Sequence, residues 1–283
     1  MEQDIQLIST TDALSAVTSA EIDKQIATAH RYPRSIDSCI KNITTLALMD
    51  EETAQQCYYH LERRSAEGTT VIEGPSIRLA EIVASSWGNL RIATRVVGND
   101  GKMVTVEGVC HDLESNVAVS QQQVRSIVTK QGYTFSNDMQ VMTINAASSI
   151  AVRNAINKVI PKAITNKIVE QCKALVRGEA EGIRLAERRQ KCIDKFASIG
   201  VTKEMLCAKL QIDTTDSITG DHLVSLIGIY NAIRDNASTL EEEFPKPKAE
   251  NQAAASARAA IQAYKENKAK GSTAPNAENN KEA

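Results

Sequence analysis

The sequence predicts an α+β fold: a three-stranded antiparallel meander packed by a long helix, with flanking helices, a small C-terminal helical module and a disordered tail. Between residues 90 and 128, short apolar segments alternate with two turn sequences, and a long helical pattern follows. Such short connections join antiparallel strands, because parallel neighbours need a longer crossover. The expected divisions are a flexible arm (1–19), a core domain (20–195), a helical module (196–244) and a disordered tail (245–283).

The first third reads as helices followed by an extended segment. Helical spacing of apolar residues runs from Ala20 to Cys57, and Ser19 or Ser35, then Asp50, are suitable caps. Residues 58–72 read as extended or looped. Ser76, after a Gly-Pro pair, is expected to start a helix over 77–87.

The middle third carries the predicted sheet and its covering helix. Strands are expected over 90–97, 103–110 and 117–128, separated by turns at 98–101 and 112–116. The first turn reads Gly-Asn-Asp-Gly, residue types that tolerate positive φ. Asn137 or Asp138 is expected to cap a helix that runs to Ile160, because Pro161 cannot continue it.

The last third is predicted to be helical and then unfolded. One helix is expected over 162–196, followed by a module over 201–236 in which Thr202 and Asp221 start helices. After Phe244 the chain becomes rich in Pro, Lys, Ala, Gly and Asn, a composition typical of disorder, with a transient helix over 253–264.

Composition and motifs exclude several protein classes. The chain of 283 residues has a formal net charge of −2 and only 4% aromatic residues. It lacks a phosphate-binding GxxxxGK[ST] loop, a dinucleotide-binding GxGxxG and any CxxC or HExxH spacing. We therefore expect no cofactor, no bound metal and no catalytic residue. The six scattered cysteines read as reduced thiols, and with no signal peptide or membrane-spanning run the expected location is the cytoplasm.

Positive charge is concentrated after the middle of the chain. Residues 153–191 contain ten Lys or Arg and four Glu, an excess of six positive charges in a nearly neutral protein. A cation stripe neutralises phosphates and releases counterions, which favours binding to nucleic acid. The alternative is a solvated helix face with internal salt bridges.

Polar residues beside this run fit the same interpretation. On a strand, Gln121, Gln123 and Arg125 share one face, and Lys130 follows; on the long helix, Arg153 and Asn157 recur at four-residue spacing. Such donors suit phosphate and sugar oxygens, although an exposed strand and a solvated helix stripe remain the alternative.

A third candidate contact lies near the N-terminus. The segment Arg31-Tyr32-Pro33-Arg34 pairs an aromatic ring with two cations, which suits base stacking and phosphate binding. Equally, Pro33 separates two helices and leaves both arginines solvated. Trp87 is expected to anchor the core.

The order of elements resembles a known family. Residues 58–82, the meander over 89–128 and the long helix over 139–161 (with Arg153-Asn154-Ala155-Ile156) are similar to the phage single-strand annealing proteins of the RecT, Redβ and Erf groups, which share a core with the eukaryotic Rad annealing protein. Residues 196–244 resemble a helical module appended to some of these proteins. The glycine-rich end of the third strand in the Rad-type core is replaced here by residues 121–125.

The resemblance implies ATP-independent binding of single-stranded DNA and annealing of complementary strands in phage-type recombination, without enzymatic activity. It further implies a homo-oligomer, as a ring or filament, and a partner exonuclease or single-strand-binding protein. For a phage protein the expected cytoplasm is that of the bacterial host. The expected DNA contacts combine cations with polar helpers: Arg125, Lys130, Arg153, Lys158, Lys162, Gln121, Gln123, Asn157, Arg31 and Arg34.

Two other functions stay open at this point. One is a non-catalytic protein-interaction or regulatory module of a phage, and the other is a nuclease-associated recombination factor. Absence of single-strand binding at low salt favours the first, and magnesium-dependent loss of DNA favours the second.

Overall fold

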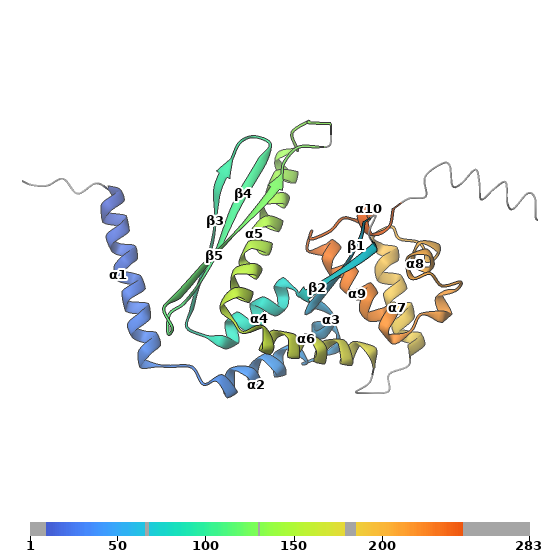
Figure 1. Cartoon of the computed structure of the whole chain (residues 1–283), viewed down its shortest axis with the longest axis horizontal. Helices are drawn as coiled ribbons and strands as arrows, with labels where there is room; N and C mark the ends of the chain where they lie inside the picture. Colours follow the sequence, from blue (N-terminus) through green and yellow to red (C-terminus); the bar gives the residue numbers. More distant parts are fainter. Residues whose placement is uncertain (1–9, 66–67, 130, 179–184, 246–283) are drawn as a thin grey trace, which may run out of the picture. The chain divides into compact units, whose positions relative to one another are not determined.

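A three-stranded antiparallel sheet with one long helix on it forms the centre of the fold, as the computed structural model shows (Figure 1). The structure describes residues 10–65, 68–129, 131–178 and 185–245. The central elements are β3 (Leu90–Asn99), β4 (Met103–Asp112), β5 (Val117–Ser126) and α5 (Asn137–Val159). The sheet order β3-β4-β5 confirms the predicted α+β meander.

The flanking elements are mostly helices. Before the sheet lie α1 (Thr10–Arg31), α2 (Ile36–Ala47), α3 (Glu51–Gln56), β1 (Tyr58–Ser65), β2 (Gly68–Pro75) and α4 (Ile77–Trp87). After α5 come α6 (Lys162–Arg177), α7 (Leu185–Ser198), α8 (Lys203–Leu210), the 3₁₀ turn η1 (Thr215–Ser217), α9 (Gly220–Arg234) and α10 (Leu240–Glu243).

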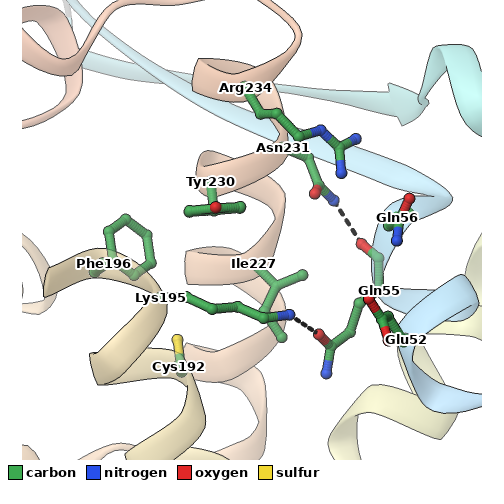
Figure 2. Close-up of a pocket in the computed structure, with 10 residues that line it drawn as sticks. All are labelled: Glu52, Gln55, Gln56, Cys192, Lys195, Phe196, Ile227, Tyr230, Asn231 and Arg234. Atoms are coloured by element: carbon green, nitrogen blue, oxygen red, sulfur yellow. Dashed lines mark hydrogen bonds between the residues drawn. The ribbon is translucent and has the colours of Figure 1, made fainter. Parts of the chain in front are cut away.

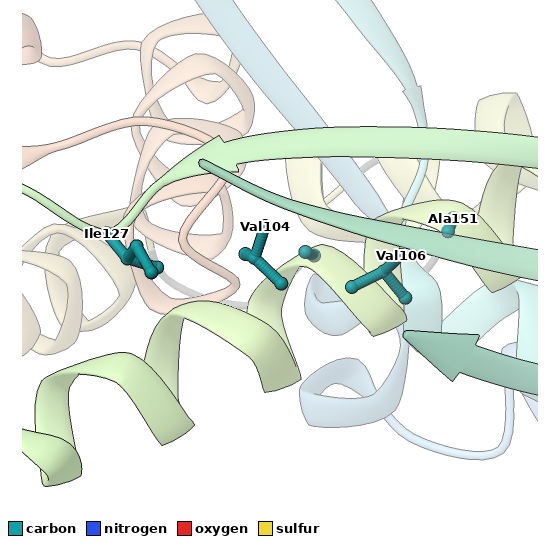
Figure 3. Close-up of a cluster of buried hydrophobic side chains, with 5 residues drawn as sticks. Val104, Val106, Ile127 and Ala151 are labelled. Carbon is teal, nitrogen blue, oxygen red and sulfur yellow. The ribbon is translucent and has the colours of Figure 1, made fainter. Parts of the chain in front are cut away.

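The helix α5 packs directly on β4 and β5, and a small apolar cluster joins them (Figure 3). Val104 and Val106 of β4 meet Ala147 and Ala151 of α5, and Ile127 closes the cluster. Small alanines let the helix backbone approach the sheet closely. This contact determines which side chains of the sheet lie beneath α5.

Several predicted helix starts are confirmed by their capping contacts. The side-chain oxygens of Ser35, Asp50, Ser76 and Thr202 each accept a hydrogen bond from the backbone N–H three residues later. Such caps satisfy amide groups that have no partner inside the helix. Trp87 is buried as expected.

Other boundaries differ from the prediction for local reasons. The helix α5 is capped by Ser136, not by Asn137 or Asp138, and α9 by Thr219, which forms a reciprocal capping box with His222, not by Asp221. The single helix expected over 162–196 is wrong, because α6 ends at Gly178 in the left-handed conformation. Glycine adopts that conformation without steric cost.

The N-terminal region also corrects the sequence interpretation. The expected loose arm over 1–19 is helical from Thr10 onward, because α1 continues without Pro or Gly to Arg31. Residues 58–75, expected to be extended or looped, form the β1–β2 hairpin. Residues 1–9 of the arm, residues 179–184 and the predicted tail with its transient helix over 253–264 lie outside the described residues, as does Lys130.

The predicted helical module over 196–244 is not separate from the core. Residues up to Glu243 form one unit, in which α9 packs on β1 and α6. Asn231 of α9 donates to the Gln55 carbonyl oxygen at 2.5 Å, and Lys195 of α7 donates to the Gln55 side chain at 2.6 Å (Figure 2). Asn231 also donates to the Tyr58 carbonyl oxygen at 2.8 Å. A cavity of about 180 Å³ remains beside these bonds.

Candidate nucleic-acid interface

The face of β5 that lies toward α5 carries the predicted polar residues. Gln121, Gln123 and Arg125 pair with Gly108, Val106 and Val104 of β4, respectively. Paired residues of an antiparallel ladder project to the same face, and Val104 and Val106 lie in the cluster beneath α5. The prediction that the three side chains share one face is therefore confirmed.

The two glutamine side chains bond to their own strand. The amide nitrogen of Gln121 donates to the Ser120 carbonyl at 2.7 Å, and that of Gln123 to the Val124 carbonyl at 3.1 Å. Both side chains are half-buried, and β5 is an edge strand. Their oxygens, and the other amide protons, are the groups that a ligand can use.

Arg125 and Arg153 lie near each other, and after burial the charge of Arg125 is a further cause that lowers the pKa of Arg153. Arg125 comes from β5 and Arg153 from α5. Arg125 donates to the Asn236 carbonyl oxygen at 2.9 Å, while its buried Nε has no hydrogen-bond partner. Two neighbouring cations bonded to neutral groups are a site that an anion can stabilise.

Arg153 is a buried cation. It is 8% exposed, and its guanidinium lies 4.7 Å from the centre of the Tyr59 ring in β1 and 3.4 Å from the Asn154 side-chain oxygen. Burial lowers the pKa of Arg153 below its ordinary value, against the opposing effects of Tyr59 and Asp235. Arg153 is therefore a buried cation whose guanidinium lies over a ring of β1.

The surrounding charges leave a positive balance. Asp235, the carboxylate that favours the charged form of Arg153, is ion-paired with Arg234 at 2.9 Å. Arg153 and Arg234 thus share this carboxylate. Asn157, one turn beyond Arg153, is half-buried, and its side-chain oxygen has no hydrogen-bond partner. We name Gln121, Gln123, Arg125, Arg153 and Asn157 the β5–α5 site.

The remaining predicted contacts have different positions. Lys158 and Lys162 are exposed at the junction of α5 and α6, and Lys158 lies about 7.5 Å along the helix from Arg153. The structure does not describe Lys130. Arg31 is exposed at the end of α1, with its guanidinium 5.6 Å from the centre of the Tyr32 ring.

Arg34 has a structural role that the sequence interpretation missed. It forms ion pairs with Asp112 (2.5 Å) and Glu114 (2.8 Å) and lies 5.0 Å from the centre of the Trp87 ring. Burial alone lowers its pKa, but hydrogen bonds to the two carboxylates raise it above the ordinary value. Because two carboxylates neutralise this guanidinium, we exclude Arg34 from the interface.

The basic run over 153–191 does not form one continuous stripe. Lys173 pairs with Glu73 and Glu170, Arg177 with Asp221, and Arg188 with Glu51, while Arg189 donates to the Ile218 carbonyl. These side chains connect helices to other elements. The alternative of salt-bridged helix faces therefore holds for this part of the run. Two residues that the sequence interpretation missed, Tyr59 and Asn236, contact the arginines of the β5–α5 site.

Comparison with protein-family models, curated proteins and solved structures finds no match to this chain. Among the described residues, no group of three or more His, Cys, Asp or Glu is placed to hold a metal ion. In the same part of the chain, no helix is both long and apolar enough to cross a membrane.

Proposed function

We propose that this chain binds single-stranded DNA at the β5–α5 site and promotes the pairing of complementary strands without nucleotide hydrolysis. The observation that carries the proposal is the juxtaposition of Arg125 and Arg153, two cations whose hydrogen bonds go to neutral groups, the Asn236 carbonyl oxygen and the Asn154 side chain. A phosphate group relieves the repulsion between them and gains a charge-assisted hydrogen bond. The resemblance to the phage annealing proteins supports the same function.

In this proposal the exposure of each residue decides whether it contacts the DNA or positions another residue. Arg125 contacts a phosphate, and the amides of Gln121 and Gln123 contact sugar or phosphate oxygens. Lys158 and Lys162 extend the cationic path, and Asn157 supports it. Arg153 is a positioning residue, because it is buried against Tyr59 and acts through its charge beside Arg125. Base pairing supplies the free energy of annealing, so the function requires no catalytic residue.

The decisive experiment replaces Arg125 by Gln and measures the affinity for a labelled oligothymidylate as a function of salt. Loss of one phosphate contact lowers the slope of log affinity against log salt by about 0.7. The matched control is Arg78→Gln, an exposed arginine on α4 that pairs with Glu81. An Arg125 variant with the same salt slope as the Arg78 variant would remove the β5–α5 site from the proposal.

We further propose that the chain acts as a homo-oligomer, in a ring or a filament, together with an exonuclease or a single-strand-binding protein. Weak contacts per subunit become effective when many subunits hold one strand. Sedimentation velocity with and without an oligonucleotide measures this directly, and a monomer under both conditions contradicts it.

A protein-interaction module is the second candidate function, and an exposed apolar surface favours it. Tyr133 is 74% exposed, and Met139, Val141 and Met142 in the first turns of α5 are about half exposed. Exposed apolar groups that gather in one patch mark partner surfaces, and three of these residues lie within four positions of one helix. Wild-type protein that binds no oligonucleotide at low salt, in which phosphate contacts are strongest, would favour this candidate.

A further inference from the structure

A second cationic cleft lies between α1 and β3, away from the β5–α5 site. It has a volume of about 540 Å³, within the range of about 300–1,000 Å³ that is typical of ligand sites. Its cations are Lys24 of α1 and Arg91 of β3, and none of the eight described residues that line it is acidic. Leu90, Ile92 and Leu113 form its apolar part.

The cleft is built by hydrogen bonds between the two elements. Arg91 donates to the side-chain oxygen of Gln25 at 3.1 Å, and Asn89 donates to the Tyr32 carbonyl oxygen at 2.9 Å. Arg34, bonded to Asp112 and Glu114, fixes the end of α1 against the sheet. These hydrogen bonds connect α1 and the segment after it to β3 and to the residues that flank β3.

An exposed aromatic ring and a third cation stand next to the cleft. Tyr32 is 64% exposed, and Arg31 lies against its ring. The backbone of Tyr32 connects it to Thr28 and Asn89, which both line the cleft. Cations that track a phosphate backbone, apolar contacts and a ring for stacking are the combination used to bind single-stranded nucleic acid.

The position of Arg91 separates this cleft from the β5–α5 site. β3 and β5 are the two opposite edges of the sheet. Arg91 pairs with His111 of β4, whereas Arg125 pairs with Val104, seven residues away, or about 24 Å. Seven is an odd number, so the two arginines also project from opposite faces of the sheet. One strand has to wrap around the sheet to reach both.

We propose that the α1–β3 cleft is a second single-strand site, which holds the incoming complementary strand while the β5–α5 site holds the first. This inference rests on the proposed annealing function and adds a site for the second strand. Annealing is a reaction of two polynucleotides, and two sites on one molecule convert their encounter into an intramolecular step with a high effective concentration. Lys24 and Arg91 contact the phosphates of the second strand, and Tyr32 stacks on one of its bases.

The test uses the full chain with the double substitution Lys24→Ala and Arg91→Ala. The control is Arg95→Ala, an arginine of the same strand and the same face that is 71% exposed in its side chain, pairs with Glu107 and lies outside the cleft. Three quantities are measured: affinity for one labelled oligothymidylate, energy transfer between donor- and acceptor-labelled oligothymidylates bound together, and the annealing rate of complementary oligonucleotides.

We expect the double variant to bind the first strand within about twofold of the wild type but to lose the energy transfer and to anneal at least about tenfold more slowly. Tyr32→Ala is expected to reduce the annealing rate and Tyr32→Phe to retain it, because stacking requires the ring and not the hydroxyl group. The Tyr32 variants change an exposed side chain, so they also test the cleft if the double variant is unstable.

The outcomes separate this inference from the proposed function. If the wild type binds and anneals but the Lys24/Arg91 variant behaves like the Arg95 variant, the second site is wrong and the proposed function stands. If the variant loses affinity only for long oligonucleotides while annealing follows occupancy, the cleft extends the first strand and the inference is overturned. If the wild type binds no single-stranded DNA, both the proposed function and the second site are wrong.

Discussion

The guanidinium of Arg153 in α5 lies 4.7 Å from the centre of the Tyr59 ring in β1. This contact joins the helix that covers the meander to the hairpin that precedes it in the chain. A cation over an aromatic face is stabilised by about 0.5–2 kcal/mol, with the larger values for desolvated pairs. The contact fixes Arg153 beside Arg125 without neutralising its charge.

Replacement of Tyr59 by Leu is expected to lower the free energy of unfolding by about 1 kcal/mol and to weaken single-strand binding, because Arg153 loses its support. Tyr59→Phe keeps the ring and is expected to retain both properties. Urea unfolding and fluorescence anisotropy with an oligothymidylate measure the two effects. Equal behaviour of the Leu and Phe variants contradicts the assigned role of the ring.

Arg153→Lys is expected to lower the free energy of unfolding but to change the salt slope of DNA binding less than Arg125→Gln does. Arg153 is buried, and in the proposed function Arg125 is the residue that contacts the phosphate. The measurement compares salt slopes of the Arg153→Lys and Arg125→Gln variants. A larger change of slope in the Arg153 variant would assign direct phosphate contact to Arg153 instead.

Gly108→Ala is expected to separate α5 from the sheet. A Cβ atom at Gly108 lies 2.5 Å from the Val152 nitrogen and closer still to the Ala151 carbonyl carbon, both backbone atoms that cannot rotate away. We expect a loss of at least about 2 kcal/mol in the free energy of unfolding. The control is Gly98→Ala in β3, where the nearest atom is 3.6 Å away and the change is expected to stay within about 1 kcal/mol. Thermal unfolding compares them, and equal melting temperatures argue against the close approach.

Acid is expected to weaken the junction of α1 with the sheet. Burial raises the pKa values of Asp112 and Glu114, but hydrogen bonds, including those from Arg34, outweigh it and hold both below the ordinary values. A lowered folded-state pKa stabilises the fold above the unfolded-state values of about 4, and this contribution is lost as the pH falls through the folded-state values.

Arg34→Gln therefore has its largest effect at neutral pH. We expect a loss on the order of 3 kcal/mol at pH 7, because the buried Asp112 and the half-buried Glu114 lose their partner, and a smaller difference from the wild type at a pH of about 3. Arg78→Gln, in an exposed pair, is expected to cost less than about 1 kcal/mol. A difference between wild type and Arg34→Gln that is constant with pH would contradict this account.

Asn231→Ala is expected to loosen α9 from the core. Its amide satisfies the carbonyl oxygens of Gln55 and Tyr58, and their loss of a partner costs about 2 kcal/mol. Hydrogen exchange of the α9 amides should become faster than in Asn166→Ala, which changes an exposed asparagine of α6. Unchanged protection in α9 means that the helix is held by other contacts.

The meander and its covering helix followed from local signals in the sequence. Turn residues at 98–101 and 112–116, alternation along the strands, and Pro161 act within a few residues, so they can be read without the fold. The shared face of Gln121, Gln123 and Arg125 follows from the two-residue period of a strand in the same way. Gly178 carried a comparable signal for the end of α6, which the long helical pattern concealed.

The tertiary structure decided which charges are available to a ligand. Arg34, Lys173 and Arg188 are ordinary cations in the sequence, but each pairs with a carboxylate that lies 78–137 residues away, and only the fold brings that carboxylate to it. The same holds for Tyr59 beside Arg153 and for Lys24 beside Arg91. Charge pairing depends on distance through space, which composition and spacing do not contain, so local sequence patterns established the scaffold and tertiary contacts determined the sites.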